Sequence, residues 1–312
     1  MPVWDQERRL CNMDIRNIKE VAPDVADGQL EKLYDLQGEL MKGYLKIEND
    51  LPEWPIDVNS RKGQVVLKDM SARVIEEMGE GYESTGYALD LLDKYGYNLD
   101  IIPMNDRQML LNHLQNSNEE QADAIAFYIE LMLYSNILPV DIYNYVERII
   151  FADPKYNNIK AGLHWRQNLQ GLMDIGLCIL EDRFWGEDKY WGIKITPYNV
   201  LDESWFETHE DYEKVKGYTP GYNHLSWAFH DQEAKYCWEI SYHLSVARNF
   251  LKNKPWKQTG EMTDEKAYQS EVVIGFIEYL GYLKFVGMDA QSAYVLRFKK
   301  HLVNVFRQTS NY

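Results

Sequence analysis

Apolar residues recur at helical spacing along most of the chain, and the alternating pattern of a β-strand is scarce. Residues 25–47 show this most clearly, because their apolar positions fall three or four apart and so form one stripe. The same periodicity predicts further helices at residues 71–84, 119–134, 140–151, 165–180, 226–251, 265–285 and 289–306. Residues 190–200 are the place where one or two short strands fit best. The pattern therefore predicts an all-α protein built as a helical bundle.

The helix expected at residues 119–134 is almost wholly apolar after its first turn, so it should be buried on most sides. Ser117 and Asn118 stand just before it and are good N-cap residues. Gln121 is placed to complete a capping box with Asn118.

Two pairs of acidic residues have the spacing that places both members on one helix face. Glu77 and Glu80 form the first pair, and Glu120 and Asp123 form the second. Four carboxylates on neighbouring helices repel one another unless a divalent cation binds between them, and Mg²⁺ or Mn²⁺ prefers such oxygen ligands. Acidic pairs at this spacing also occur on solvated helix faces, which is the alternative interpretation.

Composition narrows the functional classes. The formal charge of −16 argues against direct nucleic-acid binding, because such proteins normally carry a basic face. Three scattered cysteines without a Cys-x-x-Cys motif argue against a disulfide framework and against a cysteine-ligated zinc cluster. The sequence shows neither a signal-peptide pattern nor a run of about 20 apolar residues, so we expect a cytoplasmic protein without a membrane partner.

Two stretches of the first half of the chain recur in the second half, in the same order. The sequence LQGELM at 36–41 recurs, one residue shorter, as LQGLM at 169–173, and a shift of 151 positions lays residues 120–143 on residues 271–294 without gaps. This predicts an internal duplication, although any two pairs of apolar helices share some similarity. The expected organisation is an N-terminal extension at 1–24, a first unit at 25–157 and a second unit at 158–312. Residues 181–225 would be an insertion in the second unit, either a packing elaboration or a lid.

The two halves differ in charged residues. In this register Glu120 matches Glu271, whereas Asp123 matches Ile274, so the second copy lacks one acidic residue. Glu278, seven residues after Glu271, is a possible substitute ligand. The end of the second half carries Lys and Arg residues that its counterpart in the first half lacks.

The order of these motifs resembles the all-α nucleoside triphosphate pyrophosphatases, which include the MazG proteins, the dimeric dUTPases and the phage dCTP pyrophosphatase–dUTPases. The resemblance rests on Gln37, Trp54, the Glu77-x-x-Glu80 pair and the Glu120-x-x-Asp123 pair, in that order. The tail residues Lys300, Asn304, Arg307, Gln308 and Tyr312 look like the closing motif of the dimeric dUTPases, and the Lys-Pro-Trp-Lys sequence at 254–257 looks like the family's Trp-Lys motif. This chain departs from the family in the longer gap between its acidic helices and in Ile274.

The resemblance implies a hydrolase that uses Mg²⁺ or Mn²⁺ to convert dCTP and/or dUTP to the monophosphate and pyrophosphate. The implied catalytic metal ligands are Glu77, Glu80, Glu120 and Asp123. The residues expected to bind the deoxynucleoside triphosphate are Gln37, Trp54, Trp256, Lys257, Lys300, Asn304, Arg307 and Gln308.

One chain would then imitate the family's dimer, with acidic ligands from the first unit and phosphate-binding cations from the second; a further homodimer stays open. For a phage protein the compartment would be the host cytoplasm. Gln37 as an ordinary helix residue and Trp54 as a loop anchor are the simpler interpretations of those two positions. The alternative function is a weakly active or inactive nucleotide-binding or interaction protein of the same fold.

Overall fold

The computed structural model describes residues 28–47, 52–98, 101–156, 168–185, 227–252 and 262–309. Regular structure within these ranges is helical throughout, so the predicted all-α class is confirmed there. The strands predicted at 190–200 and the insertion at 181–225 fall largely outside the described residues. The helices are α3 (Gln29–Leu45), α4 (Arg61–Lys94), α5 (Met104–Tyr134), α6 (Pro139–Arg148), the 3₁₀ turns η2 (Ile150–Ala152) and η3 (Pro154–Tyr156), α8 (Leu169–Trp185), α10 (Trp227–Phe250), α11 (Glu265–Phe285) and α12 (Ala290–Thr309).

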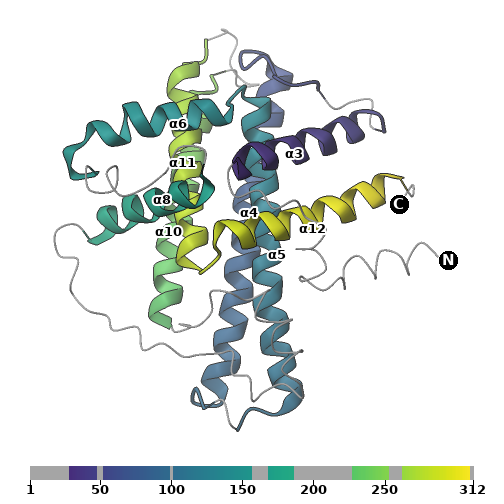
Figure 1. Ribbon diagram of the computed structural model, residues 1–312, viewed down its shortest axis with the longest axis vertical. Helices are drawn as coiled ribbons and strands as arrows, with labels where there is room; N and C mark the ends of the chain where they lie inside the picture. Colours follow the sequence, from purple (N-terminus) through teal and green to yellow (C-terminus); the bar gives the residue numbers. More distant parts are fainter. Residues whose placement is uncertain are drawn as a thin grey trace.

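A long antiparallel hairpin of α4 and α5 runs along the longest axis of the molecule (Figure 1). The pair α10 and α11 packs beside this hairpin, with α10 against α4, and α8 packs on α11. Helices α3 and α12 cross the hairpin together, in contact with each other and with α5 (Figure 1). The last segment of the chain is therefore held against the helix that carries one of the predicted acidic pairs.

The apolar part of α5 lies inside the molecule, as its composition predicted. Ala124, Ile125, Ile129 and Met132 are each at most 1% exposed and belong to the main hydrophobic core.

No single helix in the described ranges is long and apolar enough to cross a membrane. Helix α5 and residues 139–152 pass that test together by length and composition, but they are bent by 89° at the break between them.

Helix α5 begins at Met104, so the expected N-cap at Ser117 and Asn118 is wrong. Both residues lie inside the helix and are buried, at 0% and 2% exposure. The Ser117 hydroxyl lies 3.3 Å from the Thr85 hydroxyl of α4. Small polar residues at this position let the two long helices pack closely, and they imitate a capping sequence without capping a helix.

Helices α5 and α11 end in turns of the same kind. Asn136 and Gly287 follow them with positive φ angles of 55° and 84°. In each turn the next residue donates its N–H to a carbonyl five residues earlier, at 2.9 Å, which is the Schellman motif. The helices that follow begin at Pro139 and Ala290, so the spacing of 151 residues also holds for these helix boundaries.

Helices α8 and α11 touch backbone to backbone at two glycines. A Cβ atom on Gly176 would collide with the carbonyl oxygen of Ile277 and would lie 2.7 Å from the backbone nitrogen of Gly281. A Cβ atom on Gly281 would collide with the backbone of Gly176 and Leu177. Because backbone atoms cannot move aside as a flexible side chain can, the crossing requires glycine on both helices.

We expect Gly176→Ala and Gly281→Ala each to lower the free energy of unfolding by more than about 3 kcal/mol, because either methyl group pushes the two helices apart. Gly79→Ala is the matched control: it is also inside a helix, but its Cβ would have no atom within 4 Å. That variant should be neutral or up to about 1 kcal/mol more stable, because alanine favours the helix. Urea unfolding measures all three, and a loss below 1 kcal/mol at Gly281 contradicts the close crossing.

Candidate functional site

Three carboxylates meet between α4 and α5. Glu77 comes from α4, and Glu120 and Asp123 come from α5; one oxygen of each lies within 4.8 Å of the others. We call these three residues the carboxylate cluster. Their side chains are half-buried, and the antiparallel pairing of the two long helices places them at the same level. This spacing suits oxygen ligands around one divalent cation.

Burial and mutual repulsion both raise the pKa values of the two glutamates in the carboxylate cluster. The pKa of Glu77 is raised to about 8, first by burial and then by repulsion from Asp123 and Glu120. The pKa of Glu120 is also raised, first by burial and then by Asp123 and Glu80, with Lys300 acting in the opposite direction. Glu80, the fourth predicted ligand, is exposed and lies outside the three-residue group, although its charge is felt by both glutamates. The cluster thus holds more negative charge than its own protein surroundings readily stabilise.

Two lysines of α12 reach this acidic turn of α5. The Lys300 Nζ lies 2.7 Å from an Asp123 oxygen, and the Lys299 Nζ lies 3.1 Å from an oxygen of Glu119. Burial on its own lowers the pKa of Lys300, but Asp123, Glu119 and Glu120 raise it more strongly, so the amine stays charged. The acidic residues of the first half and the cations of the last helix are therefore neighbours. Lys300 was expected from the sequence, whereas Lys299 and Glu119 were not.

Gln37 takes part in a buried network behind the cluster. Its amide nitrogen donates to a Glu130 oxygen at 3.0 Å, and its amide oxygen accepts from the Arg297 guanidinium. Gln37 is only 2% exposed, so both ends of its amide are used within the protein. Its role as a direct contact to a nucleotide base stays a prediction.

Arg297 was missed by the sequence analysis. It is completely buried, and its Nε and Nη1 atoms have no hydrogen-bond partner among the described residues. Burial lowers its pKa to about 10, while the charges of Asp123 and Glu130 counteract this. A usable signal was present, because Arg297 precedes Lys300 by three residues and so shares its helix face.

The other predicted residues of α12 lie beyond Lys300. Asn304 is half-buried, and Arg307 is exposed two turns further along the helix. The Gln308 amide donates to the Leu40 carbonyl at 3.0 Å and so fixes the end of α12 to α3. These three residues therefore extend from the cluster along α12, with Arg307 the most accessible of them.

Trp54 is half-buried and packs against the main core, as a residue that anchors a loop is expected to do. It also lines a hollow of about 610 Å³ together with Tyr34 and Leu133. Trp256 and Lys257 lie outside the described residues, so their predicted roles are not tested.

A hollow of about 510 Å³ lies beside Glu80, in the groove between α4 and α5. The rings of Tyr87 and His113, with centroids 5.4 Å apart, form part of its wall. A larger hollow of about 700 Å³ lies between α6 and α11 and contains none of the four predicted metal ligands. The smaller hollow is thus the one adjacent to the predicted ligands. Its lining residues are Glu80, Glu83, Ser84, Tyr87, Asn112, His113 and Asn116.

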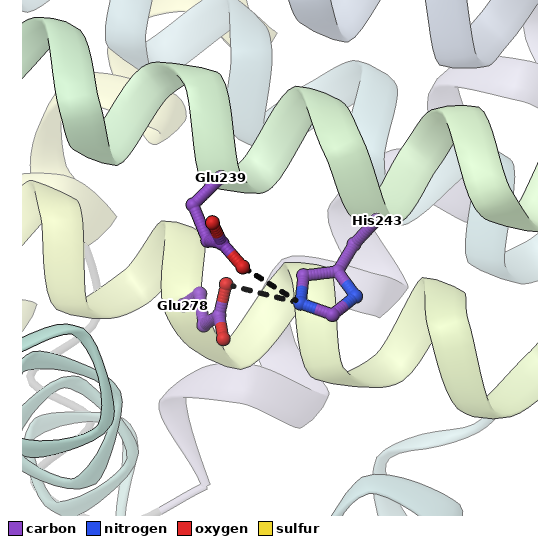
Figure 2. Close-up of side chains that lie close together, drawn as sticks. All are labelled: Glu239, His243 and Glu278. Carbon is purple, nitrogen blue, oxygen red and sulfur yellow. Dashed lines mark ion pairs between the residues drawn. The ribbon is translucent and has the colours of Figure 1, made fainter. Parts of the chain in front are cut away.

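A second group of possible metal ligands lies between α10 and α11. Figure 2 shows the carboxylates of Glu239 and Glu278 pointing to the same ring nitrogen of His243. That nitrogen, Nε2, lies 3.7 Å from Glu239 and 3.5 Å from Glu278, while Nδ1 lies 2.7 Å from Glu271. Burial lowers the pKa of His243, but Glu278 and Glu271 outweigh it and the net shift is upward. The sequence analysis considered Glu278 but missed Glu239 and His243, whose spacing of four residues places them on one helix face.

No protein-family model, no curated protein and no solved structure matches this chain. The resemblance to the all-α pyrophosphatases therefore rests on the motif residues themselves.

The stability of the protein should depend on pH through Glu130, which is mostly buried. Burial raises its pKa to about 7, so between pH 4.5 and 7 the folded state holds a proton that the unfolded state releases. The free energy of unfolding therefore falls as pH rises through this window, by up to about 3 kcal/mol. Glu130→Gln keeps an acceptor for Gln37 but cannot titrate, so its loss of stability between pH 5 and pH 8 should be smaller by about that amount.

Urea unfolding at the two pH values, without divalent ions, provides the comparison. The exposed carboxylate of Glu76 offers a control, because Glu76→Gln should keep the pH dependence of the unmodified protein. An equal pH dependence in Glu130→Gln and the unmodified protein would show that Glu130 is ionised in the fold.

Proposed function

We propose that this chain is a divalent-cation-dependent nucleoside triphosphate pyrophosphatase that acts on a pyrimidine deoxynucleotide, dCTP and/or dUTP. The observation that carries the proposal is the meeting of three carboxylates of α4 and α5 with Lys300 of α12. A triphosphate substrate needs both kinds of group, since ligands for its metal and cations for its phosphates must lie side by side. The motif resemblance adds the substrate class.

Glu77, Glu120 and Asp123 would hold Mg²⁺ or Mn²⁺, with Glu80 as a further oxygen ligand at the exposed edge. The fit rests on the donor set, which is entirely carboxylate, and on the repulsion that raises the pKa of Glu77 and Glu120. When bound, the metal supplies charge neutralisation of the phosphates and a more acidic water molecule.

The residues of α12 would hold the phosphates. Lys300 is a point charge that can turn from Asp123 to a phosphate oxygen once Asp123 binds metal. Arg307, exposed on the same helix, suits bidentate contact with phosphate oxygens, and Asn304 lies between the two. Arg297 would stabilise the negative charge of Asp123 from within the protein, because the two charges interact.

The reaction adds the oxygen of water to the α-phosphorus and breaks its bond to the oxygen that bridges to the β-phosphorus. Pyrophosphate leaves with the electron pair of that bond, and a carboxylate of the site accepts the proton from water. The products are a nucleoside monophosphate and pyrophosphate. No covalent intermediate on the protein is required.

The hollow beside Glu80 is a suitable place for the nucleoside. The Tyr87 ring can stack on a base, and the amides of Asn112 and Asn116 can donate to and accept from its edge. The hollow beside Trp54 contains Glu31, Asp35, Glu39 and Lys42, but none of the four predicted metal ligands. The accepted base would then depend on the groove between α4 and α5.

The two halves would be fused units of the MazG-like type. Support comes from the order α3, α4, α5, α6 and the matching order α8, α10, α11, α12, and from the constant spacing of 151 residues at the turns that end α5 and α11. In such a pseudo-dimer one composite site takes ligands from the first unit and cations from the second. The second unit has Ile274 where the first has Asp123, so it would lack that site.

One observation favours the alternative, a nucleotide-binding protein without hydrolysis. Lys300 already pairs with Asp123, so a protein amine partly neutralises a proposed metal ligand. A protein that binds a metal–nucleotide complex weakly and does not hydrolyse it would show the same contact. The two functions differ in turnover.

Pyrophosphate release from each dNTP in the presence of Mg²⁺ tests the proposal. We expect release from dCTP or dUTP, reduced roughly 100-fold or more in Glu77→Gln and in Asp123→Asn, because each loses a metal ligand that stabilises the transition state. Glu76→Gln, one residue from Glu77 and exposed, should keep full activity.

Two results would oppose hydrolysis by this site. Release that is unchanged in Glu77→Gln and Asp123→Asn would place the activity elsewhere. Absence of release together with Mg²⁺-dependent thermal stabilisation by a nucleotide would support the binding protein, because a ligand of the folded state raises its melting temperature.

A further inference from the structure

The group of Glu239, His243 and Glu278 is built from two neighbouring helices and closed to solvent. Glu239 and His243 stand one turn apart on α10, Glu278 faces them from α11, and the three are 6%, 7% and 0% exposed. One donor atom of each lies within 4.8 Å of the others. In Figure 2 both carboxylates converge on the Nε2 side of the imidazole ring.

His243 is held in the orientation of a metal-binding histidine. Its Nδ1 lies 2.7 Å from a Glu271 oxygen, so a ring with one proton keeps that proton on Nδ1 and points the Nε2 lone pair at Glu239 and Glu278. A carboxylate behind the histidine is the usual outer-shell partner in metal sites, where it fixes the tautomer and makes the ring a stronger ligand.

The buried carboxylate of Glu278 is stabilised by a positive charge beside it. Its side chain is fully buried, and its carboxylate forms ion pairs with Arg183 at 2.8 Å and with the His243 ring at 3.5 Å. An ionised carboxylate without hydrogen bonds is costly inside a protein unless a positive charge lies against it.

Arg183, in the last turn of α8, supplies a positive charge to the same donors. Its Nη2 lies 2.8 Å from Glu278, and its Nη1 contacts Glu239 and lies 2.9 Å from the His243 Nε2 atom. The guanidinium therefore occupies the point on which the three donors converge. About a third of the Arg183 side chain is exposed, so it can leave toward solvent without crossing the core.

We propose that Glu239, His243 and Glu278 form a second metal site, which binds a transition metal such as Zn²⁺ or Co²⁺ and in which the Arg183 guanidinium takes the place of the ion. A set of one imidazole nitrogen and two carboxylates suits these metals, whereas Mg²⁺ prefers oxygen ligands alone. The carboxylate cluster and the His243 site therefore select different ions. This inference uses no residue of the proposed catalytic site and stands without the proposed function.

Titration of the purified full-length protein with Co²⁺ tests the site, because Co²⁺ bound by few ligands gives visible absorption bands. We expect bands that saturate near one equivalent and are displaced by Zn²⁺. They should vanish in His243→Gln and persist in Asp123→Asn, a variant of the other cluster. Arg183→Met, which removes the competing guanidinium, should bind Co²⁺ at least tenfold more tightly.

Circular dichroism checks that each variant is folded, and the comparison of His243→Gln with Asp123→Asn decides the case even if Arg183→Met does not fold. The proposal is overturned if the unmodified protein gives no bands, or if the bands survive in His243→Gln. It is overturned equally if only Arg183→Met binds Co²⁺, since Arg183 would then be a permanent replacement for the ion.

Discussion

The contact between Lys300 and Asp123 brings together the two kinds of charged group that the proposed chemistry requires. It joins α12 to the acidic turn of α5, between residues 177 positions apart in the sequence. Without cations from α12, Glu77, Glu120 and Asp123 would face one another with only water and their own protons to reduce the repulsion. The packing of α12 on α3 and α5 is therefore an electrostatic requirement of the site as well as a part of the fold.

The same arrangement occurs twice among the residues that the structure describes. Carboxylates on a pair of long helices face a cationic side chain from a third helix: Lys300 of α12 at one group and Arg183 of α8 at the other. The donor sets differ, however, because the first group contains only carboxylates and the second includes His243. If the two halves are fused units, both have kept a group of metal-ligand side chains between two helices, but the two groups suit different ions.

Much of the fold follows from local sequence. Apolar spacing predicted a helical segment within each α-helix of the described residues, and the bounds predicted for residues 265–285 agree with α11. The helix predicted at residues 71–84, however, is only the middle of α4. The start of α5 was missed because Ser117 and Asn118 resemble an N-cap, although tertiary contacts with α4 use them inside a helix. Local sequence cannot show which surface a small polar residue contacts.

The site was predictable only in part. Helical spacing placed Glu120 and Asp123 on one face, but the meeting with Lys300 depends on how α12 crosses α5, which no local pattern determines. Arg297, Glu239 and His243 were missed because their significance depends on burial beside charged residues of another helix, which the local sequence does not show. Function stays a proposal that rests on these contacts.

The most direct measurement of the central claim is an anomalous diffraction map from crystals grown with Mn²⁺ and a non-hydrolysable dUTP analogue. The account predicts a manganese peak among Glu77, Glu120 and Asp123, with the phosphates against Lys300 and the ion pair between Lys300 and Asp123 opened. A nucleotide bound elsewhere, or an empty cluster with that ion pair intact, would contradict it.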